Sequence, residues 1–328
     1  MSQILVLGGG IAGLSSALVL AQKGHAVTIL ESRPYPGGRA SSYPAPGAEP
    51  AETIDNCQHI LLKCCVNLID FYDRLGVRDH IRFHDEFYFV EPGGHISLFR
   101  KGAMPPPFHF TESFAALDFL NLGEKLSIGR AILALRHQRR SRRDLDSITM
   151  LDWLREQRQR PRAIERFWRQ ILVSAITEDL DRMSAAHGFQ GFHLGFLAAA
   201  DTYEMGIPQV PLSHLYSEEI WSRVPNAKLR LRSTVRQVQV EGGRVSAVVT
   251  DSETHTADHY ISALPFHVMP AVIPALPLDL SQFEHSPITG IHLWFDRPVT
   301  ILPHATLLDR TIHWMYNKGQ GRYLLLVV

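Results

Sequence analysis

The sequence predicts an α/β fold that opens on a parallel sheet, and three observations near the N-terminus support this prediction. An apolar run over residues 4–7 is typical of a buried strand. A glycine-rich turn follows, and then an apolar pattern of helical period that stops at Gly24. A second apolar run, residues 26–30, ends in Glu31. Strand, glycine turn, helix, strand and acid in this order predict a βαβ unit of the Rossmann type.

The glycine turn of this unit is suited to binding a dinucleotide. Gly8 lets the chain turn off the strand, Gly10 lets backbone approach a diphosphate, and Gly13 allows the helix to pack closely on the strand. The N-terminus of the helix offers free N–H groups and a partial positive charge. Glu31 stands 18 residues after Gly13, where an acid accepts ribose hydroxyls and disfavours the 2′-phosphate of NADP. The alternative is a tight turn that binds nothing. The expected cofactor-binding residues of this unit are Gly8, Gly10, Ile11, Ala12, Gly13, Glu31 and Ser32.

Composition and length exclude several other classes of protein. The 328 residues are enough for about two domains, and 33 basic residues balance 33 acidic ones, which does not favour a nucleic-acid partner. The three cysteines form neither a disulfide framework nor a CxxC zinc pattern, as is typical of a reducing cytoplasm. The N-terminus does not read as a signal peptide, and no apolar run of about 18 residues exists. We expect a cytoplasmic protein without a metal site.

The distribution of motifs predicts two interleaved parts. A loop rich in Pro, Ala and Gly over residues 43–50 precedes an amphipathic helix that ends at Gly76. Residues 111–200 are mostly helical in pattern. Strands are expected at residues 87–90, 95–99, 235–240, 245–249, 260–264, 292–295 and 323–328. We therefore predict a nucleotide-binding domain from residues 1–86 and 208–268, and a substrate domain from residues 87–207 and 269–328.

Two further segments each allow two interpretations. Residues 130–169 contain 12 arginines and five acids, which suits a solvated helical face or attraction to anionic lipid at the inner face of the cytoplasmic membrane. Five large side chains recur downstream and serve either as core or as the lining of a pocket for a long isoprenoid; they are Phe189, Phe192, Phe196, Tyr203 and Met205. The chain ends within the apolar run 323–328, which we interpret as a protein cut short.

Several motifs together resemble a known family. Gly8-x-Gly10-x-x-Gly13-Leu14, Glu31 and Gly37-Gly38-Arg39 resemble the FAD-dependent amine oxidase and phytoene desaturase superfamily. Asp55-Asn56-x-Gln58-His59 and Gly206-Ile207-Pro208 resemble, more narrowly, the hydroxysqualene dehydroxylases of bacterial hopanoid synthesis. The resemblance covers nearly the whole chain, although the late Gly-Asp segment of the superfamily has no match. It implies FAD in a glutathione-reductase-like domain. It also implies that Gly37, Gly38 and Arg39 line the pyrophosphate and ribityl part, and that the backbone near Val235 contacts adenine.

The reaction implied by this resemblance is the flavin-dependent removal of the hydroxyl group of hydroxysqualene, which needs a proton donor and exclusion of water. His59 is the candidate acid, Gln58 the candidate ligand of the substrate oxygen, and Asp55 a contact of flavin or an orienting group for His59. Each has a structural alternative, such as capping a turn for Asp55. The rival functions are carotenoid desaturase, amine oxidase and an inactive nucleotide-binding fragment. An isoprenoid substrate partitions into bilayers, so peripheral membrane attachment is a further hypothesis.

Overall fold

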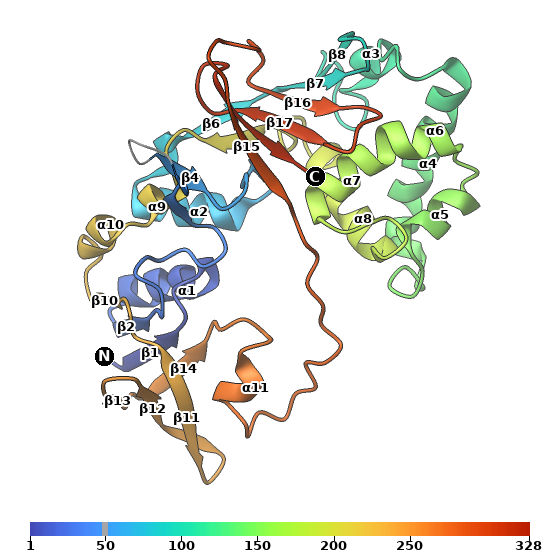
Figure 1. The fold of residues 1–328 in the computed structure, drawn as a ribbon. Helices are drawn as coiled ribbons and strands as arrows, with labels where there is room; N and C mark the ends of the chain where they lie inside the picture. Colours follow the sequence, from blue (N-terminus) through green and yellow to red (C-terminus); the bar gives the residue numbers. More distant parts are fainter. Residues whose placement is uncertain (48–51) are drawn as a thin grey trace. The chain divides into compact units, whose positions relative to one another are not determined.

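The computed structural model describes residues 1–47 and 52–328, so part of the predicted loop 43–50 lies outside the described residues (Figure 1). The chain forms two compact units. Unit 1 comprises Met1–His59, Asn67–Ile81 and Pro208–His285, and unit 2 comprises Ile60–Val66, Arg82–Ile207 and Ser286–Val328. The units differ from the predicted boundaries at residues 60–66, 82–86 and 269–285. The assignment of a nucleotide role and a substrate role to the two parts stays a prediction.

Unit 1 is built on a parallel sheet with the strand order β10-β2-β1-β14. The predicted strands and helix at the N-terminus are confirmed as β1 (Gln3–Leu7), α1 (Ile11–Gln22) and β2 (Ala26–Leu30). β14 (His259–Ser262) pairs with β1, and β10 (Ala227–Arg230) pairs with β2 (Figure 1). Helix α1 buries residues spaced three and four apart, which places them on one face; they are Leu14, Ala17, Leu18 and Ala21.

The other elements of unit 1 surround this sheet. The predicted hairpin is confirmed as β11 (Val235–Glu241) and β12 (Arg244–Thr250), and β13 (Thr254–His255) pairs with β12. Valines of the hairpin pack with Leu5, Leu7 and Leu30 of β1 and β2 in one core cluster. The remaining elements are β3 (Ser42–Pro44), β4 (Thr53–Asp55), α2 (Val66–Leu75), η1 (Arg78–His80), α9 (Leu212–Leu215), α10 (Glu218–Ser222) and α11 (Met269–Val272).

Unit 2 contains a six-stranded sheet with the order β15-β18-β17-β16-β7-β8. The predicted strands are confirmed as β7 (Glu86–Val90), β8 (Ile96–Arg100), β15 (Gly290–Trp294) and β18 (Tyr323–Val327). Two central strands, β16 (His304–Leu307) and β17 (Trp314–Asn317), were not predicted, because polar residues interrupt their short apolar runs. A smaller sheet joins β5 (Leu61–Leu62), β9 (Met205–Pro208) and β6 (Ile81–His84).

The predicted helical region is confirmed, and its helices enclose an aromatic core in unit 2. Trp153 and Trp168 are fully buried and pack edge to face, and their indole N–H groups donate to Gln138 and Gln159. No helix among the residues that the structure covers is long and apolar enough to cross a membrane. The elements are α3 (Thr111–Ala115), α4 (Leu122–Ser141), α5 (Met150–Glu156), α6 (Pro161–Ala163), η2 (Ile164–Arg169), α7 (Gln170–Ile176), α8 (Ala185–Phe192) and η3 (His193–Leu197), of which η2 and η3 are π-helical.

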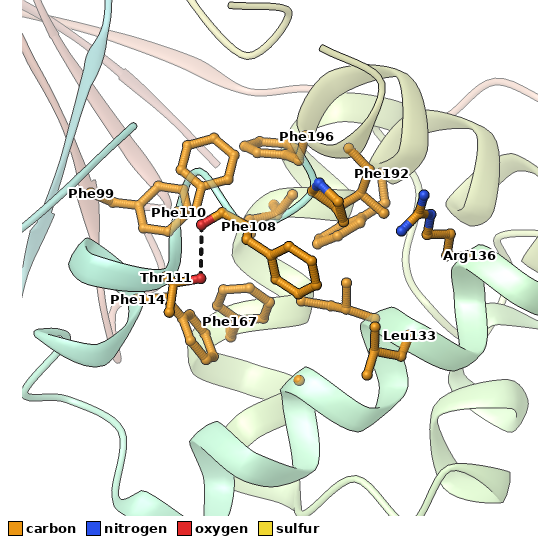
Figure 2. Close-up of a pocket in the computed structure, with 15 residues that line it drawn as sticks. Phe99, Phe108, Phe110, Thr111, Phe114, Leu133, Arg136, Phe167, Phe192 and Phe196 are labelled. Carbon is orange, nitrogen blue, oxygen red and sulfur yellow. Dashed lines mark hydrogen bonds between the residues drawn. The ribbon is translucent and has the colours of Figure 1, made fainter. Parts of the chain in front are cut away.

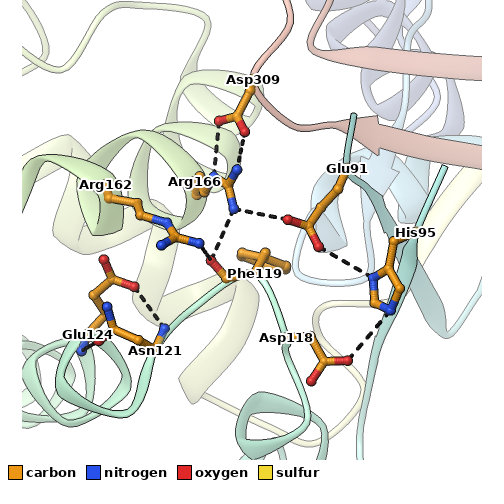
Figure 3. Close-up of polar contacts among 9 residues, drawn as sticks. All are labelled: Glu91, His95, Asp118, Phe119, Asn121, Glu124, Arg162, Arg166 and Asp309. Carbon is orange, nitrogen blue, oxygen red and sulfur yellow. Dashed lines mark hydrogen bonds and ion pairs between the residues drawn. The ribbon is translucent and has the colours of Figure 1, made fainter. Parts of the chain in front are cut away.

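Arg166 ties the helices of unit 2 to its sheet, as Figure 3 shows. Its guanidinium donates to Glu91 at the end of β7 (3.0 Å), to Asp309 after β16 and to the carbonyl of Phe119 (3.3 Å). Its side chain is only 16% exposed, so these charge-assisted bonds form largely away from water. The cluster therefore fixes η2 against the two strand ends.

Candidate functional site

The N-terminus of α1 has no side-chain cap from the described residues. Gly10 occupies the N-cap position, and no side chain in residues 1–47 and 52–328 accepts a hydrogen bond there. The first N–H groups of a helix have no partners within the helix, so those of α1 remain for a ligand. The helix has 12 residues, and its N-terminus also carries a partial positive charge. This arrangement is suited to a phosphate group.

The glycines at this end of α1 serve two different purposes. A Cβ atom on Gly13 would lie 2.0 Å from the carbonyl oxygen of Gly8, so only glycine permits this approach of helix to strand. A Cβ atom on Gly10 would meet no protein atom closer than the Cα of Gly38, at 3.9 Å. Among the described residues, a Cβ at Gly10 would therefore fit without a clash, as expected where a diphosphate approaches the backbone.

The second glycine turn comes to lie against the first. The N–H of Gly37 donates to the carbonyl of Gly9 (2.8 Å), and Gly10 and Gly37 form a β-bridge. The ring of Tyr216 packs so closely on Gly37 that a Cβ there would lie 2.4 Å from it, and its hydroxyl donates to the carbonyl of Ala40. Tyr216 is fully buried, and burial raises the pKa of its hydroxyl. Tyr216 was not predicted, because no local sequence signal connects it with the glycine turn.

Glu31 holds the first glycine turn in place. Its carboxylate is 6% exposed; Oε2 accepts from the N–H of Gly9 (2.8 Å), and Oε1 accepts from the N–H of Arg33 (2.8 Å) and the hydroxyl of Ser32 (3.2 Å). A carboxylate offers about four acceptor positions, so one remains for a ligand hydroxyl. Glu31 therefore serves the fold, and its role toward ribose stays a prediction.

The beginning of β11 lies beside Glu31. The N–H of Ser233 donates to the carbonyl of Glu31 (2.8 Å), and the N–H of Arg232 donates to that of Arg33 (3.1 Å). Val235, two residues further on, is 8% exposed and packs in the same core cluster as Leu30. The structure thus brings the predicted adenine contact near the predicted ribose contact, and the adenine contact itself stays a prediction.

Asp55 acts as a structural tether at one of its oxygens. Its side chain is 4% exposed, and Oδ1 accepts from the hydroxyl of Ser42 (2.7 Å) and from the N–H of Leu212 (2.9 Å). The same Ser42 hydroxyl accepts from the N–H of Ser213 (3.0 Å). These bonds hold β3, β4 and the start of α9 together, which favours the capping alternative for this oxygen. Contact of Asp55 with a flavin stays a prediction.

Gln58 and His59 carry polar atoms that the described protein leaves unsatisfied. Both amide atoms of Gln58 and Nε2 of His59 are buried without a hydrogen-bond partner among the described residues. Burial lowers the pKa of His59; the charge of Asp55 partly opposes this effect, and the charge of Arg39 reinforces it. At neutral pH His59 is therefore a neutral imidazole. Because unpaired buried polar groups are costly, these atoms indicate a ligand site.

Arg39 remains available to a ligand as well. Its side chain is exposed, its carbonyl accepts from the amide of Asn56 (3.0 Å), and none of the ion pairs among the described residues involves its guanidinium. With the uncapped helix, the space beside Gly10 and the fixed Glu31, this cation completes a set of groups that fits the diphosphate and ribose of FAD.

Unit 2 contains a pocket of about 210 Å³ that is lined almost wholly by apolar side chains (Figure 2). Phe192 and Phe196 line it, in agreement with the isoprenoid-lining interpretation. Phe189, Tyr203 and Met205 are not part of this lining and are buried in the core cluster of unit 2, as the core interpretation has it. Phe108, Leu133 and Arg136 also line the pocket; they were not predicted, because they come from segments distant in sequence. The full lining is Phe99, Pro107, Phe108, Phe110, Thr111, Phe114, Gly129, Ile132, Leu133, Arg136, Phe167, Ile171, Phe192, Phe196 and Leu197.

The metal-binding groups of the described residues do not converge. No cluster of three or more His, Cys, Asp or Glu side chains that could hold a metal ion occurs in residues 1–47 and 52–328. Cys57, Cys64 and Cys65 are all free thiols. Burial raises the pKa of the Cys57 thiol, which disfavours the thiolate that a reactive cysteine needs.

Fold and site together define a class of protein, namely flavin-dependent oxidoreductases of mixed α/β structure. The profile of one family, described as flavin-containing amine oxidoreductase, matches residues 11–328. The chain belongs to this family. The prediction of FAD as cofactor is thereby confirmed, and the predicted superfamily is confirmed at this coarser level.

The relatives of this chain were found by sequence similarity and by similarity of structure. In sequence, the chain is 24% identical to 15-cis-phytoene desaturase of Synechococcus elongatus over 92% of the chain and 67% of the relative. It is also 24% identical to a probable zeta-carotene desaturase of the same organism over 99% of the chain and 78% of the relative. It spans only 52% of zeta-carotene desaturase from Zea mays, at 25% identity.

In structure, the chain is similar to an oxidoreductase from Methanosarcina mazei, with a TM-score of 0.73, 17% identity and coverage of 99% of this chain and 78% of that one. It is also similar to putrescine oxidase bound to putrescine, with a TM-score of 0.71, 17% identity and coverage of 100% and 75%. At these identities the likeness concerns the fold alone.

Proposed function

We propose that this chain holds the FAD site and part of the substrate site of an oxidoreductase that acts on a long isoprenoid hydrocarbon. The pocket of unit 2 is the observation that carries this proposal. Its lining is dominated by phenylalanines, with Thr111 and Arg136 as its polar members. Such a surface binds a hydrocarbon by removing apolar area from water. The sequence similarity to carotenoid desaturases supports the same substrate class.

An amine substrate suits this pocket poorly. An amine is a cation at neutral pH, and a carboxylate close to its charge stabilises it more strongly than an aromatic face does. No carboxylate is among the described residues that line the pocket, and Arg136 in that lining repels a cation. Amine oxidation is therefore the weaker alternative, although the chain shares its fold with putrescine oxidase.

The residues of unit 1 have the tasks of binding and orienting the cofactor. In this proposal, a Rossmann-type unit made of β1, α1 and β2 receives the diphosphate at the free N–H groups of α1. Glu31 accepts from the ribose, the backbone near Val235 contacts adenine, and Gly37, Gly38 and Arg39 line the diphosphate and ribityl part. FAD, when bound, supplies a group that accepts or donates a hydride.

Two reactions are compatible with an isoprenoid substrate. Desaturation of a carotenoid precursor has the support of the curated relatives. Reductive dehydroxylation of hydroxysqualene has the support of the sequence resemblance and of one structural observation. The buried amide of Gln58 and Nε2 of His59 lack partners in the described residues, and a hydrocarbon offers none, whereas a hydroxyl group both donates and accepts.

In the second reaction, Gln58 would position the substrate oxygen and His59 would hold the proton for the departing hydroxyl. The lowered pKa of His59 makes its protonated form a stronger acid but a minor species at neutral pH. The rate should therefore rise as the pH falls toward the pKa of His59. The reaction also requires that water is excluded from the carbocation.

Turnover assays distinguish the proposals. The FAD-loaded chain is incubated with phytoene, zeta-carotene or putrescine in the presence of an electron acceptor, and with hydroxysqualene in the presence of a reductant. We expect conversion of an isoprenoid and none of putrescine; conversion of putrescine alone would contradict the proposal. If hydroxysqualene is the substrate, Gln58→Ala should lower turnover by about tenfold or more. Gln237→Ala, on the exposed face of β11, is the matched control and should leave turnover unchanged.

A further inference from the structure

Helix α4 presents leucines to solvent on the side that faces away from its packing partners. Leu122, Leu126 and Leu133 are 72%, 63% and 55% exposed, and their spacing of four and seven residues places them on one face. Ile128 and Leu135 are fully buried, and they hold the helix in unit 2 through the opposite face. Packing in the core of unit 2 therefore accounts for the buried face of α4 but not for its exposed leucines.

The loop that precedes α3 extends this apolar surface to the pocket. Phe108 is 54% exposed, and Phe108 and Leu133 both line the pocket, where Figure 2 shows them together with Arg136. Met104, four residues before Phe108, is 37% exposed. The surface formed by Phe108, Leu122, Leu126, Arg130, Leu133 and Arg136, called the α4 face below, thus continues into the pocket.

Arginines that lack acidic partners share the exposed side of α4. Arg130 and Arg136 are exposed, and neither forms an ion pair or side-chain hydrogen bond with another described residue. The positive charges of Arg136, Arg139 and Arg140 act together on His193 and, after burial, contribute to its lowered pKa. No carboxylate of the described residues neutralises this end of the helix.

The arginines after α4 differ in part. Four of the eight are paired with acids, which accounts for them within the fold; they are Arg142, Arg155, Arg166 and Arg169. Both interpretations of residues 130–169 therefore apply to part of the stretch. The later segment is partly salt-bridged, whereas only α4 combines unpaired arginines with a row of exposed leucines.

We propose that the α4 face binds the surface of an anionic phospholipid bilayer. Leucine and phenylalanine side chains enter the acyl boundary, while arginines contact the phosphates of the headgroups, as in interfacial amphipathic helices. A second copy of this chain is a less suitable occupant, because a twofold contact through this face would bring unpaired arginines against arginines. The pocket that opens on the α4 face would then receive its ligand from the bilayer; this last step rests on the proposed isoprenoid substrate.

Vesicle flotation tests the proposal without substrate. The chain is mixed with vesicles of phosphatidylcholine alone or with 30 mol% phosphatidylglycerol (about one lipid in three, a typical anionic fraction) at low and high salt. We expect binding to the anionic vesicles that weakens with salt. The double variant Leu126→Asp/Leu133→Asp should lower the partition coefficient by about tenfold or more. Arg130→Gln/Arg136→Gln should lower it by about twenty-fivefold, roughly fivefold for each charge.

Matched controls carry the same changes at exposed positions of unit 1. Leu278 is 59% exposed and Arg244 is exposed at the hairpin, so Leu278→Asp and Arg244→Gln should bind as the unmodified chain does. The proposal would be overturned if the control variants lost as much vesicle binding as the α4 variants. It would also be overturned if all variants bound the anionic vesicles equally well. Concentration-dependent self-association in ultracentrifugation that the α4 variants abolish would overturn it as well, since this would assign the face to a second copy. Failure of the chain to bind vesicles would not contradict the proposed function, which FAD binding and turnover test separately.

Discussion

Two glycines in the same motif should respond in opposite ways to the addition of one methyl group. At Gly10 the backbone has φ −73° and ψ 172°, which alanine adopts readily, and the nearest protein atom to a new Cβ is 3.9 Å away. The small loss of N-cap preference and the gain from a less flexible unfolded chain nearly cancel, so the free energy of unfolding should change by less than about 1 kcal/mol. The new methyl group nevertheless occupies the space that we assign to the diphosphate.

The expected effect of Gly10→Ala is therefore on binding. A clash of about 2 kcal/mol, typical of one inserted methyl group, corresponds to roughly thirtyfold weaker FAD binding. At Gly13 the new Cβ would lie 2.0 Å from the carbonyl oxygen of Gly8, about 1 Å inside the closest approach that real Cβ atoms show. Gly13→Ala must therefore separate α1 from β1, and we expect a loss of about 3 kcal/mol in unfolding free energy.

The assay combines urea unfolding of the apoprotein, followed by tryptophan fluorescence, with FAD titration. The reasoning would be refuted if Gly10→Ala bound FAD as tightly as the unmodified chain. It would also be refuted if Gly10→Ala lost as much stability as Gly13→Ala, because the space beside Gly10 would then belong to the fold rather than to a ligand.

Three further predictions concern side chains that carry or can take up a charge. Glu31→Gln keeps one acceptor but removes the charge that holds the glycine turn, so FAD binding should weaken about tenfold in titration while the exposed control Glu241→Gln leaves it unchanged. Arg166→Met leaves Glu91 and Asp309 without their shared cation and should cost about 2 kcal/mol in urea unfolding, whereas Arg155→Met, on the surface, should cost less than about 0.5 kcal/mol; equal costs would contradict the role of the cluster. Burial lowers the pKa of His304 from 6.5 to about 3, so the unfolded chain binds the proton more tightly, and the stability that neutral His304 provides is present above pH 6.5 and lost as the pH falls. Between pH 7 and pH 5 the unmodified chain should lose about 2 kcal/mol more than His304→Phe, and equal losses would exclude His304 as the cause.

The parts of the fold that depend on near neighbours in sequence were predictable. β1, α1 and β2 follow from apolar period, a glycine turn and an acid within 31 residues, and the hairpin of β11 and β12 follows from alternating valines around two glycines. Strand partners distant in sequence were not predictable. Ile4 pairs in register with His259, and β10 joins the other edge although its residues alternate with lysine and arginine.

In the candidate site too, features set by neighbouring residues could be predicted, whereas contacts between distant residues could not. The glycines and Glu31 were recognisable because their spacing reflects a single local turn. The tether from Asp55 to Leu212 spans 157 positions, and Tyr216 packs on a turn that precedes it by more than 170 residues. Aromatic spacing selected Phe192 and Phe196 correctly for the pocket, but it could not separate them from Phe189, which turns into the core beside Trp153. The orphaned atoms of Gln58 and His59 became visible only when burial was known.

A crystal structure of this chain with bound FAD tests the central claim most directly. We predict diphosphate oxygens within hydrogen-bonding distance of the first N–H groups of α1, with the ribose hydroxyls against Glu31. A different ligand at that helix terminus, or protein side chains filling the space beside Gly10, would contradict the account.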